Sequence, residues 1–216
     1  VQKVELYILL KNRHKNLISG FDRIQKVSRP FWIGLLSLLV ILIVGSLLLG
    51  SVYYIKVASN LPSLYVLPVL LNPTDGELLE PTRIMDQNNK EVLMSLDNPN
   101  IPRLYLSINP DEEKHINPQL LRAVVAKLDP EFWQNPGFSI RHLNNPEPVT
   151  IAERLVNDLL LWNEPDSALR PLRMRLLAAQ VVRTFGRTQV LEWYLNSVYF
   201  GHRAYGAESA AQLYFS

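Results

Sequence analysis

The chain has 216 residues, of which 48% are hydrophobic and 19% are charged, and it contains no cysteine. These values exclude a disulfide-stapled module, a cysteine-ligated metal site and a wholly disordered chain. The net charge is only +2, but residues 1–30 hold seven Lys or Arg and two Asp or Glu, whereas residues 31–216 hold fifteen and eighteen. A basic head on a slightly acidic body predicts two different environments and argues against nucleic-acid binding.

Residues 31–55 form one uncharged run and are predicted to be a transmembrane helix. A run of this length can cross a hydrocarbon core of about 30 Å, and a span in lipid must satisfy its own backbone hydrogen bonds by being helical. The predicted membrane-interface residues are Phe31, Trp32, Tyr53 and Tyr54, since such aromatic residues gather where lipid meets water. A cleaved signal peptide is the alternative, but its apolar core would be shorter.

The charges that flank this run predict its orientation. Six basic residues lie between Lys11 and Arg29, and only Lys56 closely follows the run. The positive-inside rule therefore places residues 1–30 in the cytoplasm as an N-terminal segment and the main domain outside. We expect a single-pass protein of the plasma membrane whose first partner is the lipid bilayer.

The rest of the chain predicts a linker and a mainly α domain. Residues 56–81 contain four prolines and a glycine and are predicted to be an extended or turning linker. Residues 82–96 predict a β-hairpin that turns at Asn88 and Asn89, because asparagine tolerates positive φ. Apolar residues at helical spacing and cap signals predict further helices, which run from 117 to 128, 150 to 162, 168 to 185, 188 to 199 and 207 to 214. Thr150 and Glu153 have the pattern of a capping box at the start of the second of these helices.

Two groups of side chains favour structural interpretations. The arginines at positions 170, 173, 175, 183 and 187 make one helix basic, which favours a solvated face over an anion-binding surface. Trp133, Trp162 and Trp193 are predicted to lie in the core rather than on a ligand platform. The four histidines are dispersed, so neither a metal site nor a cofactor is predicted.

The last third of the chain resembles the peptidoglycan glycosyltransferases of family 51, the domains that polymerise lipid II in class A penicillin-binding proteins and monofunctional transglycosylases. The segment Gln189–Asn196 is similar to the family's ILExYLN helix, and residues 199–215 are similar to its YFGxGxYGxxAAxxYF run. Residues 81–86 resemble its PTRIYDxNG hairpin. The resemblance implies a lysozyme-like domain over residues 82–216, which would be incomplete at its C-terminus.

The resemblance also indicates that the catalytic motifs have degenerated. The family's two catalytic Glu residues would fall on Leu128, in a run like EDxxFxxHxG, and on Met174, in a run like RKxxE. Neither side chain can accept a proton. The family's GGSTITQQL run would fall on residues 147–155, where only Thr150, Ile151 and Leu155 match. The matching positions across all motifs are Asp129, Phe132, Gly137, Thr150, Arg170, Glu192, Tyr194, Asn196, Gly201, Tyr205 and Gly206.

Fold and function are separable, so the sequence predicts a non-enzymatic membrane protein: a scaffold or accessory subunit of a membrane-protein complex. The alternative is an active glycosyltransferase with relocated acids, for which Asp129 and Glu131 are the candidates. A third hypothesis keeps lipid II or glycan binding without turnover.

Overall fold

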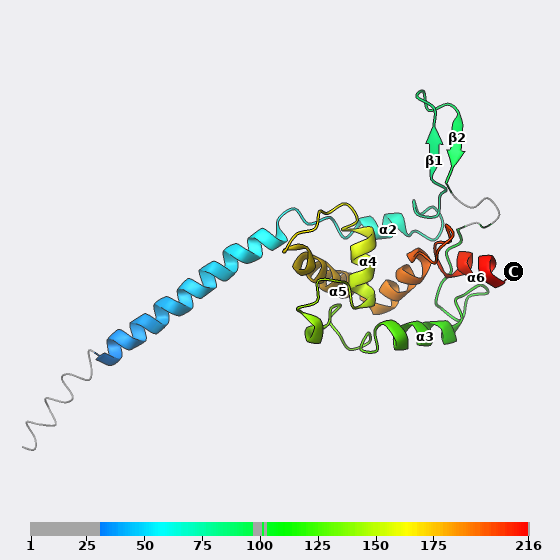
Figure 1. The fold of residues 1–216 in the computed structure, drawn as a ribbon. Coiled ribbons are helices and arrows are strands. Elements are labelled where there is room, and N and C mark those ends of the chain that lie inside the picture. Colours follow the sequence, from blue (N-terminus) through cyan, green and yellow to red (C-terminus); the bar gives the residue numbers. More distant parts are fainter. Residues whose placement is uncertain (1–30, 97–100, 102, 216) are drawn as a thin grey trace, which may run out of the picture. The chain divides into compact units, whose positions relative to one another are not determined.

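The computed structural model describes residues 31–96, 101 and 103–215 (Figure 1). The predicted cytoplasmic segment, residues 1–30, lies outside the described residues. The chain divides into two compact units, Val1–Lys56 and Val57–Ser216.

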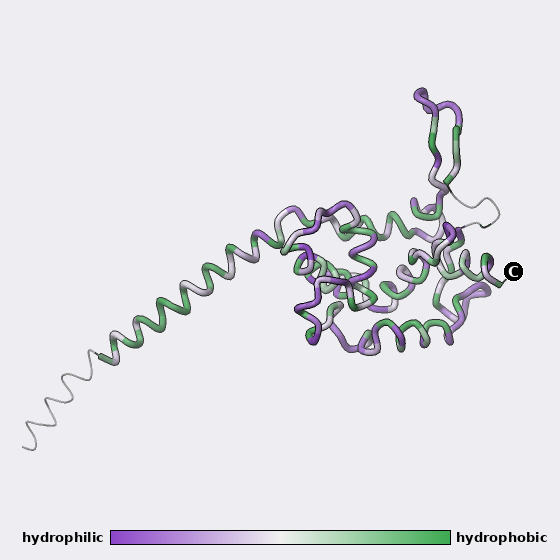
Figure 2. The backbone as a smooth tube through the Cα atoms, viewed as in Figure 1, coloured by the Kyte–Doolittle hydropathy of each residue, from purple (hydrophilic) through white to green (hydrophobic). Residues whose placement is uncertain are grey.

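Among the described residues, one apolar helix, Phe31–Ala58, is long and apolar enough to cross a membrane, as predicted for residues 31–55. Its side chains are exposed along almost the whole length, and Figure 2 shows the corresponding hydrophobic tube. The hydroxyl groups of Ser37, Ser46 and Ser51 donate to carbonyl groups three or four residues earlier, each at 2.8 Å. These hydroxyl groups form their hydrogen bonds within the helix, which suits a lipid environment where water is not available as a partner.

The second unit is mainly α with one small sheet, which confirms the predicted fold class. Its elements in chain order are α2 (Val66–Leu70), β1 (Arg83–Met85), β2 (Val92–Ser95), α3 (Pro118–Leu128), the 3₁₀-helix η1 (Ile140–His142), α4 (Ile151–Leu159), α5 (Arg170–Ser197) and α6 (Ala207–Phe215).

Strands β1 and β2 form the predicted antiparallel hairpin. Asn89 has a φ of 54°, as the asparagine turn requires. Asp86 accepts hydrogen bonds from the amides of Lys90 and Glu91, which close the turn and lower the pKa of its carboxyl group. All residues of β2 are exposed, so the turn and the strand ladder hold the hairpin together without a covering layer.

Helices α4 and α5 pack against each other and form the centre of the core. The predicted capping box begins α4: the Thr150 hydroxyl accepts from the Glu153 amide, and the Glu153 carboxylate accepts from the Thr150 amide. The predicted break between two helices is present inside α5, because Gly186 has non-helical φ and ψ of 81° and 159° and separates two helical segments at a kink.

The predicted linker packs as part of the second unit. Leu67 and Leu71, in and directly after α2, are 0% and 1% exposed and belong to the core. The prolines of this segment do turn the chain. The leucines between them bury apolar area against the helices, and this burial stabilises a packed segment over an extended one. The sequence pattern of prolines therefore missed a short docked helix.

Candidate functional site

The first predicted motif lies where α3 ends. Asp129 is the C-cap of α3 and is only 6% exposed. Its carboxylate accepts two hydrogen bonds from the Asn135 side-chain amide, at 2.9 and 3.1 Å, and one from the Ile151 amide at 3.2 Å. Burial raises the pKa of Asp129, against the lowering effect of these bonds. Asn135 stands where the resemblance predicts a histidine. Its side chain links Asp129, near the start of the motif, to the amide of Gly137 at its end.

Gly137 brings this motif directly onto α5. Its φ is +106°, and a Cβ placed there would lie 2.6 Å from the carbonyl oxygen of Ala178. No side chain fits such an approach, so the position needs glycine for both space and conformation. The Thr150 hydroxyl donates to the Gly137 carbonyl at 2.7 Å. Phe132, 1% exposed, packs beneath. These residues fix the motif's backbone.

Leu128 borders a cavity of about 230 Å³. Glu131 and Thr150 also line it, together with Val149. The Glu131 carboxylate is 48% exposed and forms an ion pair with Arg141 at 2.9 Å. An ionisable oxygen therefore lies on the same cavity as Leu128, on a side chain that is partly solvated.

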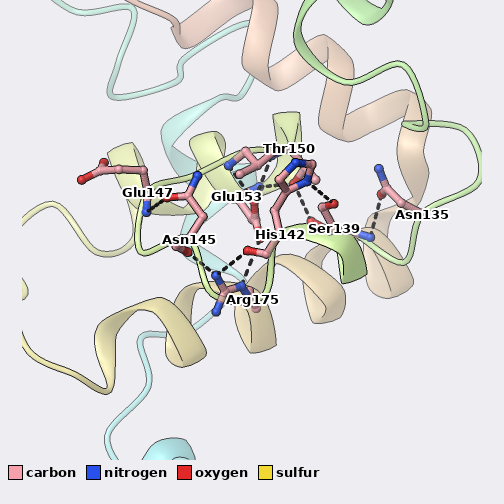
Figure 3. A network of polar contacts seen from close by, with 10 residues as sticks. Asn135, Ser139, His142, Asn145, Glu147, Thr150, Glu153 and Arg175 are labelled. Carbon is pink, nitrogen blue, oxygen red and sulfur yellow. Dashed lines mark hydrogen bonds and ion pairs between the residues drawn. The ribbon is translucent and has the colours of Figure 1, made fainter.

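A buried ion pair holds the backbone of three residues that line this cavity, His142, Val149 and Thr150 (Figure 3). The Arg175 Nε lies 3.6 Å from the Glu153 carboxylate, and the two side chains are 8% and 2% exposed. The Arg175 guanidinium also donates to the carbonyl groups of His142 and Asn145. Glu153 accepts from the amide of Val149 at 2.8 Å. We call residues 138–150 the clamped segment, because this pair fastens its backbone to α4 and α5.

Further side-chain bonds stiffen the clamped segment from within. The Ser139 hydroxyl lies 2.9 Å from the His142 Nδ1, and the Asn145 side-chain oxygen accepts from the Glu147 amide at 3.1 Å, both visible in Figure 3. Two prolines, Pro146 and Pro148, interrupt this stretch of sequence, and these bonds replace a regular backbone ladder.

Met174 lies on a different cavity, of about 180 Å³. Its side chain is 2% exposed, and Pro146, Glu147 and Pro148 form the opposite wall. The two positions at which the resemblance predicts catalytic acids thus border separate cavities. Residues 146–150 of the clamped segment supply walls to both.

The basic helix is not a solvated face, which corrects that prediction. Arg173 forms an ion pair with Glu164 at 2.8 Å and is 13% exposed. Arg170 donates to the side chains of Asp166 and Asn157, at 2.9 and 3.0 Å. Guanidinium groups offer five donors in a fixed fork, which suits them to collecting several acceptors at once.

Arg187 follows the same pattern, since it donates to the carbonyl groups of Phe132 and Asn135 at 3.1 and 2.7 Å. Only Arg183, among the five arginines singled out, is exposed. The acceptors lie 30 to 55 residues away from Arg175 and Arg187 in sequence, so no local pattern could have revealed them.

The tryptophans divide in their exposure. Trp193 is 4% exposed and lies in the core, as predicted. The core prediction is wrong for Trp133 and Trp162, which are 53% and 74% exposed. A large aromatic residue signals burial in sequence, but both of these lie in irregular segments beside prolines, where the helical period gives no direction.

The predicted motif residues on α5 hold a distant strand-like segment. Glu192 accepts hydrogen bonds from the Tyr105 hydroxyl at 2.6 Å and the Ile108 amide at 3.0 Å. Asn196 accepts from the Leu106 amide at 2.8 Å and donates to the Leu106 carbonyl at 2.9 Å. Burial raises the pKa of Tyr105, and the bond to Glu192 raises it further. These contacts are structural. Tyr194 is buried on the same helix, and burial raises its pKa as well.

The glycine-rich motif forms a tight turn between α5 and α6. The rings of Tyr199 and Tyr205 lie 4.9 Å apart, and the Arg103 guanidinium lies 4.5 Å from the Tyr205 ring centroid. A Cβ at Gly206 would lie 2.8 Å from the Asn196 carbonyl oxygen. Gly201, with a φ of +92°, opens the turn, which then passes through positive φ at two non-glycine residues, His202 and Arg203. The motif shapes the chain and presents no reactive group.

Within the described ranges, no group of three or more His, Asp or Glu side chains is placed to hold a metal ion.

Comparisons with known proteins agree with the resemblance. Residues 148–216 match the family described as Transglycosylase. The chain is 30% identical over 196 residues to penicillin-binding protein 1A of Aquifex aeolicus, an alignment that covers 85% of the chain and 24% of that protein. It is 27% identical over 191 residues to penicillin-binding protein 1A of Vibrio cholerae, covering 83% and 21%.

A third relative, penicillin-binding protein 2D of Bacillus subtilis, is 28% identical over 123 residues, which cover 47% of this chain and 16% of that protein. The chain thus spans about a quarter or less of the length of these curated relatives.

Proposed function

Because this chain belongs to glycosyltransferase family 51, we propose that it is a membrane-anchored, catalytically degenerate member of the family. It serves as a scaffold or accessory subunit of a membrane complex. The apolar helix holds it in the plasma membrane, with residues 1–30 in the cytoplasm and the family domain outside.

The observation that supports this proposal is that Leu128 and Met174, at the two predicted acid positions, line different cavities. Sugar transfer needs one carboxylate to take the acceptor proton and a second acid to assist the leaving group, both at one reaction centre. Leu128 and Met174 border separate cavities, with the clamped segment between them. Apolar side chains at both positions and a divided cleft support a domain without turnover.

Lipid II polymerisation by the purified full-length chain tests the proposal. We expect no glycan chains under conditions in which an active penicillin-binding protein 1A forms them. Glycan chains made without another enzyme would overturn the proposal. Purification from native membranes then tests the scaffold role, for which we expect a stoichiometric membrane-protein complex that survives mild detergent.

Glu131 favours a second candidate function, an active glycosyltransferase with a relocated acid. Its carboxylate borders the same cavity as Leu128 and is accessible to solvent. In this case Glu131→Gln would reduce polymerisation by roughly 10²–10⁴-fold, the usual effect of losing a general base. Glu91→Gln, at an exposed residue of the hairpin outside both cavities, is the matched control and would leave the rate unchanged.

Binding of lipid II without polymerisation is a third outcome. It would assign the Leu128 cavity as a retained substrate site. A direct binding measurement with labelled lipid II, paired with the polymerisation assay, separates this outcome from both other functions.

A further inference from the structure

Trp162 is held rigidly outward by the turn that follows α4. Leu161 is 1% exposed, whereas the next residue, Trp162, is 74% exposed. The Glu164 amide donates to the Leu161 carbonyl at 3.0 Å, and the Arg170 guanidinium donates to the same carbonyl at 3.3 Å. Single exposed apolar residues are common on protein surfaces. Here the preceding residue is buried and its carbonyl group accepts two hydrogen bonds, so the turn places the indole ring on the surface.

The same turn is fastened to the residues that leave the apolar helix. Arg173, which pairs with Glu164, also donates to the carbonyl groups of residues 57, 59 and 60 at 3.2, 2.7 and 3.0 Å. Residue 60 is an asparagine with a φ of 56°, a conformation that ends helices. Val57 is 6% exposed. One guanidinium therefore joins the exit of the apolar helix to the turn that carries Trp162.

We propose that Trp162 docks into the interfacial layer of the bilayer and sets the contact of residues 57–216 with the lipid surface. The inference rests on the proposed membrane placement of the apolar helix. Indole rings favour the zone where lipid headgroups meet acyl chains, because they have an apolar body and a polar N–H. That zone is about 5–8 Å deep on each side of the hydrocarbon.

Distance and charge identify the bilayer as the occupant. Trp162 is two residues from Glu164, so its backbone lies within roughly 7 Å of the residue that contacts the Arg173 clasp. The clasp itself binds residues directly after the helix that ends at Ala58. Glu164 and Arg173 neutralise each other. Docking thus depends on the indole ring, and we expect it to be insensitive to salt and to the fraction of anionic lipid.

The absence of cysteine allows single-site labelling. The full chain is reconstituted in vesicles of phosphatidylcholine and phosphatidylglycerol, with or without brominated acyl chains, after an environment-sensitive fluorophore is attached to a single introduced cysteine. Asn163→Cys, at the exposed residue beside Trp162, reports the proposed contact and keeps the indole ring in place. Tyr54→Cys, near the end of the apolar helix, is the positive control, and Asn88→Cys, in the exposed hairpin turn, is the negative control.

We expect a blue-shifted emission and bromine quenching at position 163 comparable with those at position 54, and neither at position 88. Quenching at 54 but not at 163 would overturn this inference alone and favour a protein contact at Trp162. Loss of quenching at both sites would overturn the membrane placement as well. Quenching at 163 that disappears at high salt would overturn insertion in favour of electrostatic adsorption.

A second variant tests the clasp. Adding Glu164→Gln to the position-163 label weakens the link to Arg173 while keeping the side chain's shape. We expect reduced quenching at 163 and unchanged quenching at 54. An unchanged signal at 163 would show that Arg173 does not position this turn and would overturn that part of the inference.

Discussion

The region around the first motif, residues 128–150, and the C-terminal motif region, residues 192–215, differ in what their side chains do. In the first, Leu128 borders a cavity, while Asp129 and Gly137 hold the backbone. In the second, Glu192 and Asn196 hold a segment about 85 residues away. The matching residues Asp129, Gly137, Glu192 and Asn196 make structural contacts, whereas Leu128 and Met174, where acids are predicted to be lost, border cavities. A family pattern can therefore persist in a chain for reasons of packing alone.

The buried ion pair between Arg175 and Glu153, which fastens the clamped segment, should contribute more to stability than any other contact discussed for the two regions. Arg175→Met leaves Glu153 buried without its partner, and such losses cost about 3–5 kcal/mol of unfolding free energy. Chemical denaturation of the detergent-solubilised chain measures it. Arg183→Met, on the exposed face of the same helix, is the control, and Glu153→Gln with Arg175→Met should recover most of the loss. Equal stability of the two single variants would contradict the assignment.

Restoring acids at the two predicted catalytic positions should have unequal costs. Met174→Glu places a carboxyl group at a site that is 2% exposed and should lower the unfolding free energy by about 2–3 kcal/mol. Leu128→Glu, on the edge of its cavity, should cost less than about 1 kcal/mol. Thermal unfolding ranks the two. We expect no polymerisation from either variant or from the pair, and recovered activity would show that the division of the cleft is unimportant.

The turn of the C-terminal motif contains a residue that should be suboptimal. Arg203 has a φ of 64°, a conformation that costs a non-glycine residue about 1 kcal/mol. Arg203→Gly should therefore raise stability by up to that amount, less the added freedom of the unfolded chain. Arg203→Ala keeps the strain and removes the side chain, so it should leave the stability unchanged. An equal gain in both variants would assign the effect to the side chain.

The smallest expected effect is a pH dependence at Asp129. Its pKa is raised by burial, so the folded chain binds a proton more tightly than the unfolded chain. Its contribution to stability is therefore fully present below the ordinary carboxyl pKa and is lost as the pH rises through the raised pKa of the folded chain. Asp129→Asn removes this dependence. Denaturation between pH 4 and pH 7 should show the wild-type chain gaining stability relative to the variant at the acidic end.

Much of the fold followed from local signals, whereas the fastening of the site did not. The Thr150 capping box, the asparagine turn and the break at Gly186 depend on neighbours in sequence, and the structure contains all three. Arg175 and Arg187 bind carbonyl groups, which every residue possesses, so the sequence gives no sign of their partners. The exposure of Trp162 was missed because its turn is irregular and burial there is decided by the neighbouring Leu161.

Gly137 meets the carbonyl of Ala178 through main-chain atoms. A main-chain contact of this kind does not depend on the chemistry of the surrounding side chains. It requires only that position 137 remains glycine. Mutations can accumulate on either side of it, and with them a reaction can be lost, while the two pieces of chain stay in register. The architecture of this part of the domain therefore depends on Gly137 more than on the side chains around it.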